Sequence, residues 1–245
     1  MADLVLTDLK IYIDGYDFSA YHNQANLTLG TETADNTCYG DDSRNYKPGL
    51  KSFTFEHSGF ADFADNSQDE VFVDTLFGTS DKVLTVCPTG TEAEAVYFAK
   101  QVLTKYELTG MVGEMCGFAG AGVSQVGPSG IIRGTLMETG AQTATGNGTA
   151  RQLGAVSATQ YLYAVIHCTA VSGTGTPTIT VKVQSDDNES FTSATDRITF
   201  TAITAIGAQW ATRVSGAITD DWWRINMTVT GTTPSLTIHT SVGIQ

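Results

Sequence analysis

The sequence of 245 residues predicts a mainly β protein in two parts. We expect residues 1–140 to form a β-sandwich or barrel with one or two flanking helices, and residues 141–245 to form an Ig-like β-sandwich. Three observations support this fold class. Apolar residues alternate with polar ones over many short stretches. Charged residues make up only 16%, with 25 glycines, against a usual charged content of about 25%. Threonine becomes frequent after residue 140, with 22 among the last 105 residues.

The N-terminal part opens on a predicted hairpin. Leu9, Ile11 and Ile13 alternate with other residues, and the pair Asp14-Gly15 is a favoured two-residue hairpin turn. Further strands are predicted at 25–32, 50–60, 82–88 and 130–138, with a looser, glycine-rich alternation at 110–125. Residues 33–49 predict a long polar loop, and loops of this length are often functional or assembly arms.

Two helices are predicted from capping boxes, in which a Ser or Thr is followed three residues later by Glu. Ser67 begins the first pattern, with apolar residues behind it and Gly78 as the stop signal. Thr91 begins the second, ahead of residues 95–106, where apolar residues recur at helical spacing. Both helices would flank the strands of the N-terminal part.

The C-terminal part is predicted to be strands alone. Residues 139–150 are small and polar, which is typical of a linker. The strands predicted beyond it are 160–171, 178–185, 196–203, 208–216, 222–231 and 235–244. Trp223, Ile225 and Met227 would share one face of the penultimate strand, so a β-sandwich core is expected there.

Charge is distributed unevenly between the two parts. Residues 1–140 carry 20 acidic and 8 basic side chains, whereas residues 141–245 carry 6 and 5. Affinity for nucleic acid comes mainly from Lys and Arg meeting phosphate, so the acidic part is expected to repel DNA. The asymmetry also suggests that the two parts have different roles.

No targeting or membrane segment is predicted. The first residues lack a basic n-region and a long apolar core, so we expect synthesis in a cytoplasm and no membrane partner. The four cysteines, Cys38, Cys87, Cys116 and Cys168, lack close pairing and are expected to be free, buried and apolar in character. No metal site is expected from their spacing. The glycosylation triplets at Asn26, Asn147, Asn188 and Asn226 carry no meaning without secretion.

No catalytic residue and no cofactor-binding motif is predicted. The four histidines are His22, His57, His167 and His239, and each is expected to be a strand side chain with a hydrogen-bond partner. No nucleophile elbow, HExxH, P-loop or dinucleotide fingerprint occurs. The glycine-rich residues 117–122 are expected to allow close backbone packing.

Two acidic clusters leave alternatives open. Residues 185–190 would hold calcium with carboxylates and carbonyls, or form a turn in which Asp and Asn cap the backbone, which we favour. Asp220 and Asp221 adjoin two tryptophans, a combination that can bind sugar. Alternation points Trp223 inward and leaves Trp222 as a platform on which Arg224 would stack, but core plus strand edge is the favoured interpretation.

The chain as a whole resembles the major tail proteins (tail tube proteins) of long-tailed, non-contractile bacteriophages. The resemblance rests on "LKIYIDGYDFSAYHNQANLTLGTETAD", "PGLKSFTFEHSGFAD" and "GIIRGTLMETG" in the first part. In the second part it rests on "LYAVIHCTAVSGTGTPTITVKVQSDDNESF" and the residues that follow, through "AITDDWWRINMTVTG". It covers nearly the full length through phrases of sequence, not a catalytic signature.

The resemblance implies a structural virion protein, not an enzyme, with a tail tube domain at 1–140. Such proteins form homo-oligomeric rings, expected to be hexameric, that stack helically in the siphovirus tail. The tape-measure protein and the tail-terminator and distal tail proteins are implied partners. DNA passes through the lumen during genome ejection without specific binding. The implied location is the virion tail, assembled in the host cytoplasm, and residues 33–49 are a natural inter-ring arm.

Alternatives remain at the level of assembly and of function. If residues 141–245 were a second tube-like domain and not an outer decoration, three chains would close a ring in place of six. A different function would be a capsid- or tail-surface module whose β-sandwich binds host glycans through Trp222. A glycan hydrolase with paired carboxylates is the third possibility and the weakest, because no acidic pair sits in a cleft-forming context.

Overall fold

The computed structural model describes residues 6–125 and 130–245. The described residues are mainly β, as predicted, with strands that pair in one open sheet. Residues 1–5, which open the predicted N-terminal part, lie outside the described residues, as do residues 126–129. No helix in the described ranges is long and apolar enough to cross a membrane.

The chain divides into two compact units, which are described separately. Unit 1 comprises residues 1–19, 83–98 and 132–245, and unit 2 comprises residues 20–82 and 99–131. This division differs from the predicted one, because residues 132–140 belong to the same unit as residues 141–245. The boundary at residue 140 therefore remains a prediction that residues 1–140 and residues 141–245 have different roles.

Unit 1 is built around a long two-stranded ribbon of β11 (Tyr161–Asp186) and β15 (Trp222–Ile244). The two strands pair antiparallel from Leu162 opposite Ile244 to Asp186 opposite Trp222. The remaining strands of unit 1 are β1 (Lys10–Ile13), β2 (Tyr16–Asp17), β5 (Lys82–Cys87), β8 (Ile131–Gln142), β9 (Gly146–Asn147), β10 (Arg151–Gln152), β12 (Thr195–Thr199), β13 (Gly207–Trp210) and β14 (Val214–Ser215).

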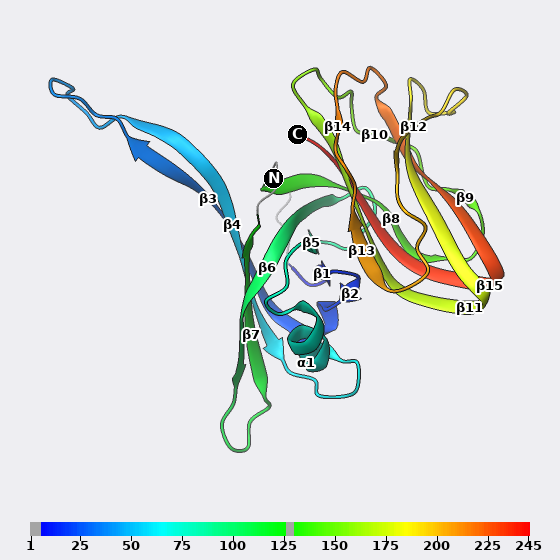
Figure 1. The fold of residues 1–245 in the computed structure, drawn as a ribbon, viewed down its shortest axis with the longest axis horizontal. Helices are drawn as coiled ribbons and strands as arrows, with labels where there is room; N and C mark the ends of the chain where they lie inside the picture. Colours follow the sequence, from blue (N-terminus) through cyan, green and yellow to red (C-terminus); the bar gives the residue numbers. More distant parts are fainter. Residues whose placement is uncertain (1–5, 126–129) are drawn as a thin grey trace. The chain divides into compact units, whose positions relative to one another are not determined.

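The ribbon replaces four separate strands of the predicted sandwich. Residues 172–177, expected to connect two separate strands, are a bulged part of β11, and residues 231–235 are the matching part of β15. Gly173 and Gly231 have φ of 119° and 122°, which glycine adopts without the steric cost that a side chain would bring. The ribbon curves there (Figure 1), and residues from both of its halves enter one core.

The core of unit 1 confirms the predicted inward faces. Trp223 and Ile225 are fully buried, and Met227 is nearly so, in a cluster shared with residues of β11 and β15. The Trp223 Nε1–H donates to the Gly154 carbonyl at 2.8 Å, so its polar atom is satisfied inside the core. A Trp of this size dominates the burial of apolar area, which makes the face of β15 a major source of stability.

The predicted opening hairpin is confirmed. Asp14 and Gly15 have φ of 52° and 91°, as a two-residue turn with two left-handed positions requires. The turn joins β1 to β2, and β1 also pairs with β5 from Lys10 opposite Cys87 to Ile13 opposite Leu84.

Unit 2 is a four-stranded antiparallel sheet with one flanking helical segment. Its strands run in the order β3 (His22–Asp35), β4 (Tyr46–Phe60), β7 (Gly117–Ser124) and the later part of β6 (Ala95–Thr109). A short 3₁₀ turn, η1 (Ser19–Tyr21), precedes β3. The helical segment is α1 (Gln68–Glu70), which continues as the π-helical η2 (Val71–Leu76).

One predicted helix is confirmed and the other is wrong. At the first, Ser67 makes no cap bond and its hydroxyl donates to the Asp62 carbonyl at 2.6 Å, while Glu70 accepts from the Asn66 backbone N–H. Residues 95–106, the predicted second helix, lie in strand β6. This stretch contains Val96 and Phe98, which are residue types enriched in strands, and Leu103, which packs in the sheet. Buried and more exposed side chains alternate along much of it. Pairing with β7 therefore overrides the helical spacing.

Two histidines lie opposite each other in the ribbon of unit 1. His167 is fully buried, with Nδ1 accepting from the Gly15 N–H at 3.2 Å and Nε2 hydrogen-bonded to the Thr85 hydroxyl at 2.8 Å. His239 bonds to the Thr139 hydroxyl at 2.6 Å and stacks on Tyr12. Burial lowers the pKa of His167 to about 3 and that of His239 to about 4. Both imidazoles are therefore neutral at neutral pH.

We predict that unit 1 loses stability in acid. The unfolded chain protonates histidine near pH 6.5, whereas the folded pKa values of His167 and His239 are about 3 and 4. Stability is thus complete above about pH 6.5 and falls as pH drops toward those values, by roughly 1.4 kcal/mol per pH unit for each histidine. Urea unfolding followed by tryptophan fluorescence between pH 7 and pH 5 measures this slope, before most carboxylates titrate.

The control is His167→Gln, which keeps a polar side chain but cannot titrate. This variant should be less stable at pH 7 and should show a shallower slope between pH 7 and pH 5. An unchanged slope in the variant would contradict the assignment of the pH dependence to His167.

Candidate assembly surface

The sheet of unit 2 has two faces of different character. Along β4, Phe53, Phe55 and His57 are buried on the inner face, and Thr54, Glu56 and Ser58 are more exposed on the outer face. The register carries this alternation across the sheet, because Glu56 lies opposite Asn26 on β3 and Ala121 on β7. The outer face is therefore polar across several strands, because successive side chains along each strand point to opposite faces of the sheet.

The inner face packs aromatic rings against the helical segment. Phe72 of η2 lies 5.3 Å from the His57 ring and 5.5 Å from the Tyr106 ring, measured between centroids. The Tyr106 hydroxyl donates to Asp69 at 2.5 Å, and the burial of Tyr106 together with the Asp69 carboxylate raises the pKa of this phenol. These contacts fix the sheet on one side and leave the polar face free.

His22 and His57 form a pair at the inner face. The His22 Nε2 lies 2.7 Å from the His57 Nδ1, and His57 is 3% exposed. Burial, and secondly the neighbouring His22, hold the pKa of His57 well below its usual range. The pair lies among the rings of Phe55, Phe72 and Phe118. It is part of the packed aromatic inner face of the sheet.

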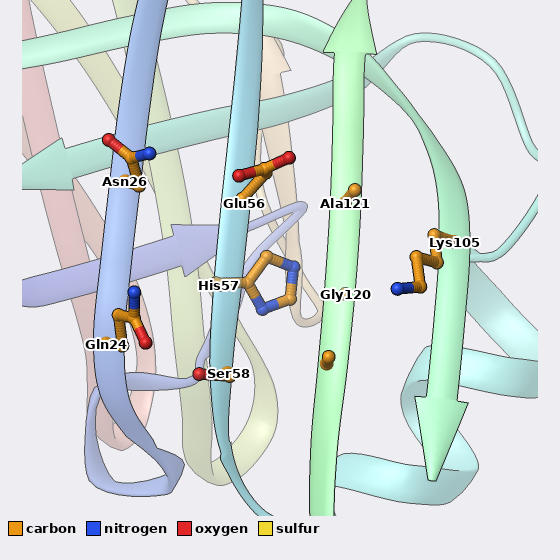
Figure 2. Close-up of a pocket in the computed structure, with 9 residues that line it drawn as sticks. Gln24, Asn26, Glu56, His57, Ser58, Lys105, Gly120 and Ala121 are labelled. Carbon is orange, nitrogen blue, oxygen red and sulfur yellow. The ribbon is translucent and has the colours of Figure 1, made fainter. Parts of the chain in front are cut away.

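A shallow hollow lies on the polar face (Figure 2). Its walls are Gln24 and Asn26 of β3, Glu56 and Ser58 of β4, and Lys105 of β6. Its floor is β7, where the small residues Ala119, Gly120 and Ala121 leave room between the longer side chains. His57 of β4 lines the hollow as well, so the groups that meet here are amides, a hydroxyl, an imidazole and charges of both signs.

The charges on this face are solvated. Lys105 Nζ lies 2.5 Å from Glu107 Oε2, and both side chains are about half exposed. The hydrogen bond to Glu107 raises the pKa of Lys105, and Glu56 contributes more weakly. Exposed ion pairs of this kind contribute little to stability. They act instead on charged molecules that approach the face. There the carboxylates of Glu56 and Glu107 outnumber the single ammonium of Lys105, which leaves an excess of negative charge.

Beyond this body, β3 and β4 continue as a two-stranded arm, which we define as residues 29–53. β7 reaches only as far as Thr54, so the arm has no third strand in the described residues. Nearly every arm residue is exposed, including Leu29 (60%) and Leu50 (75%). Within the predicted loop 33–49, residues 36–45 form the irregular tip of the arm, whereas residues 33–35 and 46–49 are the ends of β3 and β4 (Figure 1).

The arm lacks a third strand, and β3 lacks a second neighbouring strand, among the described residues. An isolated two-stranded ribbon is marginal in water, since it cannot cover an apolar face. Within the described part of the chain, β3 pairs with no strand other than β4, so from residue 23 to residue 35 its other edge presents backbone N–H and C=O groups that no neighbouring strand pairs. Such an edge is a template for pairing with another strand.

The glycines of β7 serve close packing, as predicted. A Cβ on Gly120 would lie 2.4 Å from the His57 ring, and a Cβ on Gly122 would overlap the Gln101 amide. Gly120 and Gly122 therefore make room for buried polar side chains of the neighbouring strands, and residues 117–122 form a strand and not a phosphate loop.

The acidic cluster 185–190 is a capped turn. Asp186 is buried and accepts backbone N–H groups of Asp187 at 2.7 Å and Ser193 at 2.8 Å. Its pKa is lowered by these hydrogen bonds, although burial opposes the shift. No group of three or more His, Cys, Asp or Glu suited to a metal ion occurs among the described residues.

The second cluster supports the strand-edge interpretation over sugar binding. Asp220 accepts from Ser185 at 2.7 Å and from Arg197 at 2.9 Å, so it closes a local network. The prediction that Arg224 stacks on Trp222 is wrong: its guanidinium lies 4.3 Å from the Phe191 ring centroid, and its Nε–H donates to Gln184. Trp222 lies half-buried opposite Gln152 and Asp186.

The cysteines are all free, but not all are buried. Cys87 and Cys168 are buried as expected, and burial raises the pKa of the Cys87 thiol to about 12. The prediction is wrong for Cys38, which is exposed at the tip of the arm, and for Cys116, which is half-exposed beside β7. Cys38 lies in a turn-rich loop, where its backbone N–H donates to Asp41 at 2.8 Å and its thiol donates to the Asn36 carbonyl at 3.7 Å.

No protein-family model matches the chain, and no curated protein matches it with significance. Solved structures do match. The virion of a native gene transfer agent particle matches with TM-score 0.42 and 17% identity, over 51% of this chain and 96% of the other.

A second match is the tail of an empty gene transfer agent particle of C6 symmetry, with TM-score 0.40 and 16% identity over the same shares. The SPP1 Dit (gp 19.1) protein, described as a paradigm of the hub adsorption apparatus in phages that infect Gram-positive bacteria, matches with TM-score 0.37 and 11% identity over 96% of this chain and 98% of the other. All three TM-scores are low, and the function is therefore inferred from the chain's own residues.

Proposed function

We propose that this chain is a structural phage tail protein that assembles with copies of itself into the rings of a tail tube. The observation that carries the proposal is the unpaired edge of β3 together with the exposed arm that continues it. A sheet edge of 14 residues that faced solvent would be an aggregation site, unless another chain pairs with it. Because the sequence resembles tail tube proteins, we interpret that pairing as the contact that joins copies into a ring.

In the proposed ring, the β3 edge of one copy pairs with the last part of β6, residues 104–109, in the next, since the earlier part of β6 already pairs with other strands of its own chain. Repetition of one such heterologous contact closes a ring if the rotation suits, and a hexamer is the expected number. The sheets of unit 2 would then join into a cylinder whose wall is one strand layer thick. Backbone hydrogen bonds would supply the affinity of the contact, as in other strand additions.

The polar face of the sheet would line the bore. Gln24, Asn26 and Ser58 offer neutral polar groups, and Glu56 and Glu107 offer carboxylates. DNA carries one negative charge for each phosphate, so an excess of carboxylates weakens its adhesion to the wall. The genome and the tape-measure protein would pass without specific binding, while tail-terminator and distal tail proteins would meet the ends of the tube. Residues 141–245 are proposed to lie on the outer surface of the virion tail.

Hydrogen–deuterium exchange tests the edge pairing. Peptides from β3 (His22–Asp35) should exchange rapidly at the free edge of the monomer and become protected on assembly, because outward N–H groups acquire acceptors. Peptides from β11 serve as the matched control, since that strand is paired on both sides along much of its length in the single chain. If assembled rings show β3 exchange equal to that of the monomer, the proposed contact is wrong.

Charge substitution tests the bore. The variant with Glu56→Lys and Glu107→Lys should still assemble, because both side chains are exposed, but its tubes should bind duplex DNA at least about tenfold more tightly at low salt. The neutral variant with Glu56→Gln and Glu107→Gln controls for loss of the ion pair with Lys105. Equal DNA binding by both variants and the parent protein would place this face away from the DNA path.

A further inference from the structure

We propose that the loop at the end of the β6–β7 hairpin, residues 110–116, is an apolar contact site for the arm of a second copy of this chain. The inference rests on the proposed function, since it specifies how copies meet along the tube axis. It adds a contact between two copies, in which the loop at one end of the first copy's sheet meets the arm at the opposite end of the second copy's sheet.

The loop holds apolar side chains out to solvent. Met111, Val112 and Met115 are 77%, 108% and 70% exposed, which is unusual for three large apolar residues within five positions. The backbone fixes this display: the Glu114 N–H donates to the Met111 carbonyl at 3.0 Å, and Gly113 takes a φ of 91°. The loop is thus a formed turn with its apolar side chains outside.

Neighbouring residues enlarge the apolar surface. Leu108, at the end of β6, is 48% exposed, and Phe60, which pairs with Gly117, is 47% exposed. Phe63, 58% exposed, follows Ala61, whose N–H donates to the Cys116 carbonyl at 2.9 Å. Exposed apolar side chains that gather in this way mark interaction sites.

The arm and the loop lie at opposite ends of the sheet. β7 pairs with β4 from Thr54 opposite Val123 to Phe60 opposite Gly117. The arm continues from the Thr54 end, whereas the loop precedes Gly117 at the other end. A contact between these unlike ends cannot close on itself between two copies, so it propagates along the strand direction.

Apolar surface and two local charges favour the arm as the partner. Glu114 is the one charged residue of the loop, and on the arm Lys47 and Lys51 lie on either side of the exposed Leu50, with Glu32 on the paired strand. Packing Met111 and Val112 of one copy on Leu50 of the next brings the carboxylate toward these ammonium groups. The same contact covers the exposed apolar residues of the arm, which has no third strand of its own.

Cysteine crosslinking tests this contact. In a chain that carries Cys38→Ser and Cys116→Ser, we add V112C and L50C and treat the assembled protein with a short bismaleimide. A heterologous contact should yield a ladder of crosslinked oligomers, because each copy offers both reactive ends. The two single variants should yield no ladder, and a dimer from V112C alone would show a loop-to-loop contact and overturn the proposal.

A charged variant gives the second measurement. Val112→Asp with Met115→Asp should leave the thermal unfolding of the protein unchanged, because both residues are exposed, and should leave rings intact in electron micrographs. The fraction of protein that sediments as stacked tubes should fall at least tenfold, whereas Thr204→Asp, an exposed site in unit 1, should match the parent.

The outcomes separate the two proposals. If the charged variant stacks as the parent does, the loop contact is wrong and the ring proposal stands. If the parent protein forms neither rings nor stacks and no ladder appears, both proposals fail.

Discussion

Every backbone N–H and C=O in a β protein needs a partner, and the edge of a sheet is where that requirement is hardest to meet. In unit 1 the long strand β11 pairs with β15 on one side and with β12, β13 and β14 on the other, and these three single-partner strands are short, at two to five residues each. In unit 2 the strand with a single partner in the described residues is β3, which has 14 residues. This long edge is the reason for proposing that a second chain pairs with it.

The sheet of unit 2 also separates its two tasks by face. Stability comes from the inner face, where Phe55, Phe72 and Phe118 pack around the His22–His57 pair. The outer face holds small and polar residues and contributes little to the core. Because side chains alternate along each strand, the outer face can change its charge without disturbing the packing. A surface that must let a polyanion pass can therefore be tuned independently of the fold.

Local patterns predicted the β elements well and their connections poorly. The Asp14-Gly15 turn and the inward face of Trp223 follow from two-residue chemistry and period-two alternation, and both are confirmed. Residues 95–106 carry helical spacing, but they lie in β6, which pairs with β5, β7 and β8, and no pattern within the stretch itself shows these partners. The two ends of the arm fall in the strands predicted at 25–32 and 50–60, but residues 33–35 and 46–49 were predicted as loop because they are polar and show no alternation. The pairing of His22 with His57 needs the register of β3 on β4, which no local pattern contains.

The composition of the arm fits an edge that must pair with one partner and resist others. Lys47, Pro48 and Lys51 interrupt the arm, and charged residues and proline are the usual means by which edge strands avoid indiscriminate pairing. The register shift between Thr31 and Thr33 twists the ribbon further. Leu29 and Leu50 nevertheless remain exposed among these protective residues. A ribbon that only needed to stay soluble would carry no such leucines, and a ribbon that only needed to adhere would carry no such lysines. Both kinds together favour a contact that forms when a matching surface, with apolar side chains and a carboxylate, is presented in the correct geometry.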